Sequence, residues 1–332
     1  VARGRRGWPG SGPIPVASDP SKLDSEWGML RNKSLKQGRT LAYSFERHET
    51  VAVGVGRIIG ELTWTTTQEL YPSHPRHQDW VHNTRTRYKR VRSLLRLVRD
   101  SLGDEVYRAE MDRIREATGL LSRLRDAEVL VQTADLLAEH IAEDDRLAQL
   151  RQWLGERYRQ ISHIETNIQQ LLLATAREMD ELTLRSANWQ LPEDYDQPLR
   201  QFTRCYSRGL RQMGVAFEQP GDEVFHDWRK RVKDYYYHFQ LFGMAWSPTM
   251  SLRVDDIKLL SDLLGEDHDI AVLREVLSAE TGAPEMSPQL DEKVRGFQQE
   301  LRDRSKALAE RVYDYEPDAL ADELRRIFER WH

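Results

Sequence analysis

The chain has 332 residues, which is long enough for two domains that each bury a core. Its single cysteine excludes an internal disulfide, and no run approaches the about eighteen apolar residues of a membrane span, so we expect a cytoplasmic protein without a membrane partner. The net charge of -5 argues against a general attraction for polyanions, so a polyanion site requires local clustering of Arg and Lys.

The N-terminal residues predict a lead-in segment outside the fold. Arg3, Arg5 and Arg6 precede a stretch rich in Gly and Pro that lacks the apolar core of a secretory signal. We therefore expect a flexible segment over residues 1–23.

Helices are predicted throughout residues 24–190, the first of two expected domains. Leu, Arg, Glu and Ala dominate the composition, which favours helices over strands and indicates an almost all-α protein. The expected helices cover residues 24–70, 79–102, 104–141 and 145–186. The two prolines of YPSHPRHQ end the first helix, and Gly103 is placed to cap the second.

The second expected domain covers residues 191–332 and repeats this rhythm. The boundary lies in NWQLPEDYDQP at 188–198, which combines Asn, two prolines and acidic residues. Further helices are expected near residues 198–218, 222–246, 250–281, 286–313 and 317–331. Each half thus has the pattern of a four-helix bundle with short connections.

One cationic pattern, H-x-x-R-x-x-x-K, occurs in both halves. Its copies are His82, Arg85 and Lys89, then His226, Arg229 and Lys233. Chance gives roughly a few hundredths of a copy in a chain of this length, so two copies followed by similar apolar tails indicate duplication. We expect two related anion-binding halves.

Helical geometry separates a cationic edge from an apolar face in both copies. A step of 100° per residue aligns His82, Arg85, Lys89, Arg92 and Arg96 in one stripe, which spans about 21 Å. The second copy aligns His226, Arg229, Lys230, Lys233 and Tyr237. The aromatic residues Trp80, Tyr88, Trp228 and Tyr235 fall in the apolar phase, where packing is the expected role.

The first stripe has no interleaved acid between Asp79 and Asp100. Like charges at this spacing oppose helix formation by a few tenths of a kcal/mol per pair, so an external anion is a natural compensator. An extended anionic chain suits the length of the stripe. A further stripe of Arg200, Arg204, Arg208 and Arg211 offers Arg204 and Arg208 as secondary contacts, and Lys33, Lys36, Arg39 and Arg47 form another basic group.

These motifs resemble the CHAD domain, the conserved histidine α-helical domain, over most of the chain. The family's first basic helix is similar to the run that contains His82, Arg85, Lys89, Arg90, Arg92 and Arg96. Its later pattern, a leucine-rich turn before an Arg-Asp or His-Asp pair, resembles LLSRLRDAEVL at 120–130 and LSDLLGEDHDIAVL at 260–273.

The resemblance implies two pseudo-symmetric four-helix bundles with a central basic cavity that binds inorganic polyphosphate and can direct proteins to polyphosphate granules. The residues expected to bind polyphosphate are His82, Arg85, Lys89, Arg90, Arg92, Arg96, Arg204, Arg208, His226, Arg229, Lys230 and Lys233. No catalytic residue, metal or cofactor is expected. Asp126 and Asp269 are expected to orient arginines or cap turns, and Asp234 and Tyr236 stand where arginines are common in the family, which predicts weaker binding by the second half.

The two motif histidines supply a pH hypothesis. If His82 and His226 donate to phosphate, a bound anion stabilises the imidazolium form, and affinity should increase from about pH 8 to pH 6.

Two other functions remain open. A metal-dependent phosphohydrolase of the HD type is suggested by His226-Asp227 and His268-Asp269, and metal analysis with a hydrolysis assay would identify it. A nucleic-acid-binding protein is the other, because phosphate backbones are attracted to the same stripes. Competition of polyphosphate against DNA or RNA would distinguish a nucleic-acid-binding protein from a polyphosphate-binding one. Other polyanions, such as inositol polyphosphates, also remain possible ligands.

Overall fold

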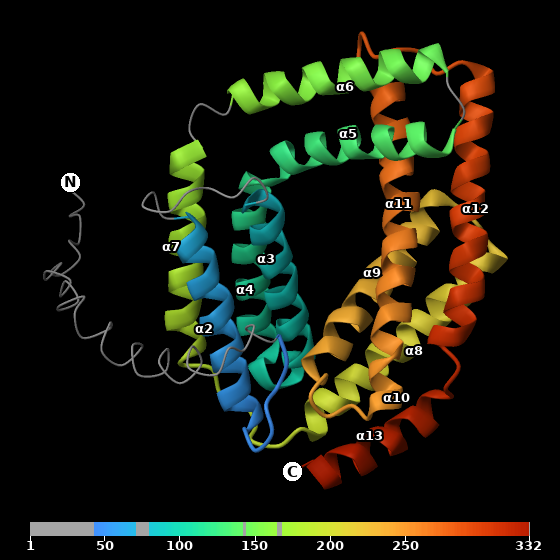
Figure 1. Cartoon of the computed structure of the whole chain (residues 1–332). Coiled ribbons are helices and arrows are strands. Elements are labelled where there is room, and N and C mark those ends of the chain that lie inside the picture. Colours follow the sequence, from blue (N-terminus) through green and yellow to red (C-terminus); the bar gives the residue numbers. More distant parts are fainter. Residues whose placement is uncertain (1–42, 71–79, 142–143, 165–167, 332) are drawn as a thin grey trace, which may run out of the picture. The chain divides into compact units, whose positions relative to one another are not determined.

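The computed structural model describes residues 43–332 apart from 71–79, 142–143, 165–167 and 332 (Figure 1). The expected lead-in of residues 1–23 and the first part of the helix expected from residue 24 lie outside these residues. Residues 43–332 form one compact unit, so the domain boundary expected at residues 190–191 falls inside it and stays a prediction.

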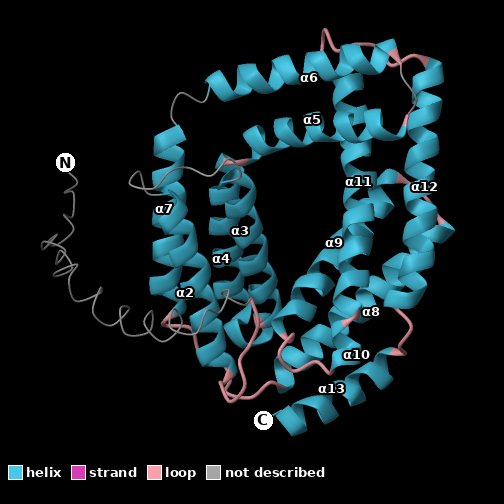
Figure 2. Ribbon diagram, viewed as in Figure 1, coloured by secondary structure: helices cyan, strands magenta, loops and turns pink. Residues whose placement is uncertain are grey.

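Every regular element of the described residues is a helix, which confirms the all-α prediction (Figure 2). The helices are α2 (Val51–Leu70), α3 (Trp80–Leu97), α4 (Arg99–Leu120), α5 (Ser122–His140), α6 (Asp145–Ile164), α7 (Ile168–Ser186), α8 (Asp196–Glu218), α9 (Asp222–Leu241), α10 (Pro248–Ser251), α11 (Arg253–Ala279), α12 (Pro288–Val312) and α13 (Pro317–Trp331). None of them is long and apolar enough to cross a membrane.

Two expected helices are interrupted. The helix expected over residues 104–141 is α4 and α5, which meet at Leu121. Gly103, which was expected to cap the preceding helix, instead forms a kink within α4. Gly103 has a φ of 76°, a conformation that glycine adopts without steric cost. The helix expected over residues 145–186 is described as α6 and α7 on either side of residues 165–167.

Residues 43–50 connect distant parts of the chain rather than extending α2. The amides of Val51 and Ala52 donate to the carbonyls of Glu193 and Pro192, at 3.1 Å each, which satisfies two donors that a helix start leaves open. The amide of Phe45 donates to the carbonyl of Leu241 at the end of α9, at 2.7 Å. Backbone hydrogen bonds between the two expected halves therefore fix the start of α2 and the end of α9.

The helices pack in two groups joined by a hairpin. Helices α2, α3, α4 and α7 contact one another, and α8 packs on α9, α9 on α11, and α11 on α12. Helices α5 and α6 lie side by side and cross from the α3–α4 side to the α11–α12 side at the top of the view (Figure 1). The pseudo-twofold relation between two bundles stays a prediction.

A continuous apolar core fixes the rotation of α3 and α9. Tyr88 on α3 and Trp228 and Tyr235 on α9 are at most 1% exposed, which confirms their expected packing role. Trp80 is half-buried against Leu70 and Ala176. Because one face of each helix is buried in this way, the neighbouring cationic edges are turned out of the core.

Candidate anion-binding cavity

A cavity of about 870 Å³ is lined by residues of α3, α5, α6, α9 and α11. Among the described residues, eleven arginine and lysine side chains line it against three aspartates, a net of eight positive charges before histidines are counted. The cations are Arg85, Lys89, Arg92, Arg96, Arg123, Arg125, Arg157, Arg229, Lys230, Arg231 and Lys233. We call this space the central cavity.

The repeated pattern supplies both walls of the central cavity. Helix α3 contributes His82, Arg85, Lys89, Arg92 and Arg96, and α9 contributes Arg229, Lys230 and Lys233. Spacings of three and four residues keep each set on one helical edge, beside the face that carries the buried aromatics. The structure therefore brings together eight of the twelve residues expected from the sequence.

Two lysines of the cavity lie beside arginines. Burial, together with nearby Arg85 and Arg229, lowers the pKa of Lys89 from 10.5 to about 8. Burial, together with Arg229 and Lys89, lowers the pKa of Lys233 to about 7. Neither ammonium group forms an ion pair with a described residue, so the folded chain leaves the charged form of both lysines largely uncompensated.

Two arginines of the cavity have buried nitrogen atoms without a described partner. The buried Nε atoms of Arg92 and Arg229 have no hydrogen-bond partner among the described residues. Burial lowers the pKa of both guanidinium groups. Buried donors without acceptors are costly, and the oxygens of a bound anion would satisfy them.

Three carboxylates temper the positive charge from other helices. Arg96 of α3 pairs with Asp234 of α9 at 2.7 Å, and Arg85 lies 3.8 Å from Asp126 of α5, which agrees with an orienting role for Asp126. Asp269 lines the cavity, and burial raises its pKa although nearby Arg229 and Lys233 act in the opposite direction. The acid that the sequence of α3 lacks is thus supplied partly by its neighbours.

The two motif histidines differ in position. His82 is exposed and lines the cavity, whereas His226 is absent from the lining and its Nδ1 lies 3.1 Å from Nδ1 of His268. Burial and then Lys230 lower the pKa of His226, and burial with Arg229 lowers that of His268 to about 3. One ring must donate and the other accept in this contact, and the low pKa of His268 makes it the neutral acceptor. The contact is therefore compatible with a charged His226, and it is the lowered pKa of His226 that acts against the charged form in the ligand-free protein.

Three expected residues lie elsewhere. Arg90 faces away from the cavity, with its guanidinium carbon 5.2 Å from the ring centroid of Tyr43, because it follows Lys89 by one residue and is rotated about 100° around α3. Arg204 and Arg208 belong to a neighbouring hollow between α4, α8 and α9, where Arg204 pairs with Asp100 at 2.9 Å.

Four further cations were not expected from the repeated pattern. Arg123 and Arg125 of α5 lie inside the LLSRLRDAEVL segment, so a helical-wheel comparison of that segment could have found them. Arg231 lies between Lys230 and Lys233 in the α9 sequence. Arg157 of α6, whose Nε lies 2.8 Å from Oε2 of Glu280, is brought in by tertiary packing, for which local sequence carries no signal.

Within the described residues, no group of three or more His, Cys, Asp or Glu side chains is placed to hold a metal ion.

Comparisons with known proteins identify the family of the chain. No curated protein matches the chain. The sequence profile of the CHAD domain matches residues 67–278, which include both copies of the cationic pattern and every residue that lines the cavity. The chain belongs to the CHAD-domain family.

Proposed function

We propose that the chain binds inorganic polyphosphate in the central cavity without catalysing a reaction, and that this binding associates it with polyphosphate granules in the cytoplasm. The observation that carries the proposal is the convergence of the two duplicated cationic edges, from α3 and α9, on one cavity. Family membership supports the same ligand.

The charge arrangement favours a polymer over a single phosphate group. Lys89 and Lys233 are buried beside arginines that lower their pKa values, so the ligand-free cavity holds repelling charges. One phosphate could contact only a few of the cations, whereas a chain of phosphates can bridge both walls. Charge-assisted hydrogen bonds contribute about 1.5 to 3 kcal/mol each, so several give submicromolar affinity after ordering costs.

The histidines support binding rather than hydrolysis. A metal-dependent hydrolase uses histidine and aspartate side chains that converge on a cation. Here His226 and His268 contact each other, and burial, together with Arg229 and Lys230, lowers the pKa of both rings. The positive charges beside the two rings oppose the binding of a metal cation and favour the binding of an anion.

The decisive test is a titration with long-chain polyphosphate of the wild type and the double variant Arg85→Ala/Arg229→Ala. We expect about a hundredfold loss of affinity, because the variant removes one guanidinium from each wall. The matched control is Arg146→Gln/Arg177→Gln, which removes two exposed charges outside the cavity and should bind like the wild type.

Competition separates the alternatives. Displacement of labelled polyphosphate by an equal charge concentration of DNA or RNA as effectively as by polyphosphate would favour a nucleic-acid-binding protein. Stoichiometric metal with turnover of polyphosphate or a nucleotide would favour the hydrolase. Unchanged affinity in the Arg85→Ala/Arg229→Ala variant, with helicity retained by circular dichroism, would contradict the proposed site.

A further inference from the structure

The central cavity adjoins a second hollow of about 330 Å³ between α4, α8 and α9. Arg96, Arg231 and Asp234 line both spaces, so these three side chains stand between them. The second hollow adds Arg204 and Arg208 of α8. Cationic side chains therefore line both spaces, and two of the three side chains at their boundary are arginines.

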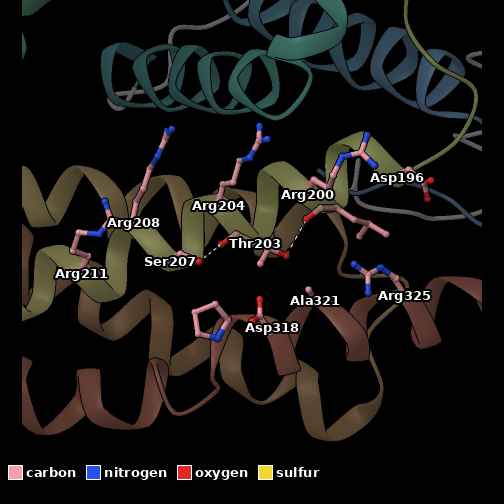
Figure 3. Close-up of a pocket in the computed structure, with 12 residues that line it drawn as sticks. Asp196, Arg200, Thr203, Arg204, Ser207, Arg208, Arg211, Asp318, Ala321 and Arg325 are labelled. Atoms are coloured by element: carbon pink, nitrogen blue, oxygen red, sulfur yellow. Dashed lines mark hydrogen bonds between the residues drawn. The ribbon is translucent and has the colours of Figure 1, made fainter.

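A third hollow of about 430 Å³ continues the path along α8 and α13. It shares Arg204 and Arg208 with the second hollow. Figure 3 shows Arg200, Arg204 and Arg208 extending from α8 in a common direction, away from Asp318 of α13. Their four-residue spacing produces this alignment and gives a cationic row about 12 Å long at 1.5 Å per residue.

Some of the arginines along this path form no ion pair with a described carboxylate. Arg204 pairs with Asp100 at 2.9 Å, and Arg96 pairs with Asp234 at 2.7 Å. Arg208 and Arg231 are both exposed, and neither forms an ion pair with any described residue. An incoming anion can therefore contact Arg208 and Arg231 without first displacing a carboxylate.

We propose that Arg204 and Arg208, reached past Arg96 and Arg231, form a second subsite for the same polyphosphate molecule. The chain that leaves the central cavity lies along the α4–α8 hollow and continues onto the exposed face of α8. This inference rests on the proposed function and extends it to a preference for long chains. A compact anion held in the central cavity cannot reach the subsite at the same time.

The gain for a long chain comes from local concentration. Once one segment is held in the central cavity, the next segment meets Arg204 and Arg208 as an intramolecular partner. Exposed contacts are individually weak, but this linkage makes their contribution measurable for a polymer. Tripolyphosphate, which has no trailing segment, gains nothing from them.

The test compares tripolyphosphate with long-chain polyphosphate on the variant Arg204→Gln/Arg208→Gln. We expect about a tenfold loss of long-chain affinity and no change for tripolyphosphate. The salt dependence gives a second measurement, since the slope of log affinity against log salt for the long chain should fall by about one for each lost contact. Arg146→Gln/Arg177→Gln again removes two exposed charges and should change neither quantity.

The outcomes separate this inference from the proposed function. If the wild type binds polyphosphate and Arg85→Ala/Arg229→Ala loses it, but Arg204→Gln/Arg208→Gln keeps its long-chain affinity and salt slope, the subsite is refuted and the central site stands. If the wild type binds no polyphosphate, both fall together. Equal losses for tripolyphosphate and the long chain would also overturn the subsite, because they place Arg204 and Arg208 at the primary site.

Discussion

The two copies of the cationic pattern reach the same cavity in different surroundings. On α3, His82 is exposed and Arg85 lies 3.8 Å from Asp126. On α9, His226 lies against His268, and the buried Nε of Arg229 lacks a partner among the described residues. The lysines differ in the same sense, since the pKa of Lys233 is about 7 and that of Lys89 about 8. Equal spacing along a helix therefore fixes direction, whereas burial by other helices fixes the electrostatic cost of each charge.

The comparison bears on the relative strength of the two halves. Asp234 and Tyr236 led us to expect weaker binding by the second half, and that expectation stays a prediction. The stronger lowering of the pKa of Lys233, by burial and by Arg229 and Lys89, acts in the opposite direction, because a bound anion relieves more repulsion there. Single substitutions in the two copies can decide between these effects.

The largest effects on affinity are expected for the single variants Lys233→Met and Lys89→Met. Both should bind long-chain polyphosphate at least about tenfold more weakly, with the greater loss for Lys233→Met. Both should also raise the melting temperature of the ligand-free protein, because a buried and repelled charge is removed. Titration and thermal unfolding measure the two effects. A lower melting temperature with unchanged affinity would show that the lysines are structural.

The same lysines predict an effect of pH with opposite signs for binding and stability. Their pKa values in the folded protein lie below 10.5, so between about pH 7 and pH 10 the unfolded chain holds more protons and ligand-free stability should rise with pH. A bound anion raises the pKa of both groups, so affinity should be highest below about pH 7 and fall as the pH rises through 7 to 9.

Calorimetry in buffers of different ionisation enthalpy should detect proton uptake on binding near pH 8. The double variant Lys89→Met/Lys233→Met should lose most of this uptake. If it keeps the full pH dependence while His82→Gln abolishes it, the titrating group is the histidine of the first copy instead.

The smallest effect is expected for Asp234→Asn, which touches the boundary between the two hollows. The change frees Arg96 from its 2.7 Å ion pair and adds one net positive charge to the cavity. Affinity for long-chain polyphosphate should increase by about threefold to tenfold, since an internal competitor is removed. Glu323→Gln on α13, which also removes one carboxylate from an ion pair, is the control. Weaker binding by Asp234→Asn would mean that the carboxylate positions Arg96 for the ligand.

Local sequence predicted the parts of the site that depend on one helix. The edges of α3 and α9 follow from residue spacing and from aromatic positions such as Tyr88 and Trp228, both of which are buried. Arg157 and the Arg96–Asp234 pair depend on contacts between helices far apart in the chain, which periodicity cannot reveal. The break at Leu121 lies two residues after Gly119, which lowers helix propensity but does not by itself end a helix, so local sequence did not predict a break there.

The backbone contacts of residues 43–52 affect how the protein can be divided. The amides of Val51 and Ala52 use the carbonyls of Glu193 and Pro192, and Phe45 uses that of Leu241. A fragment ending at residue 190 would therefore lose the acceptors for the start of α2, and its complement would lose a strap across the end of α9. Because these hydrogen bonds cross the expected boundary, we expect the two halves not to fold separately. They should unfold in one cooperative transition.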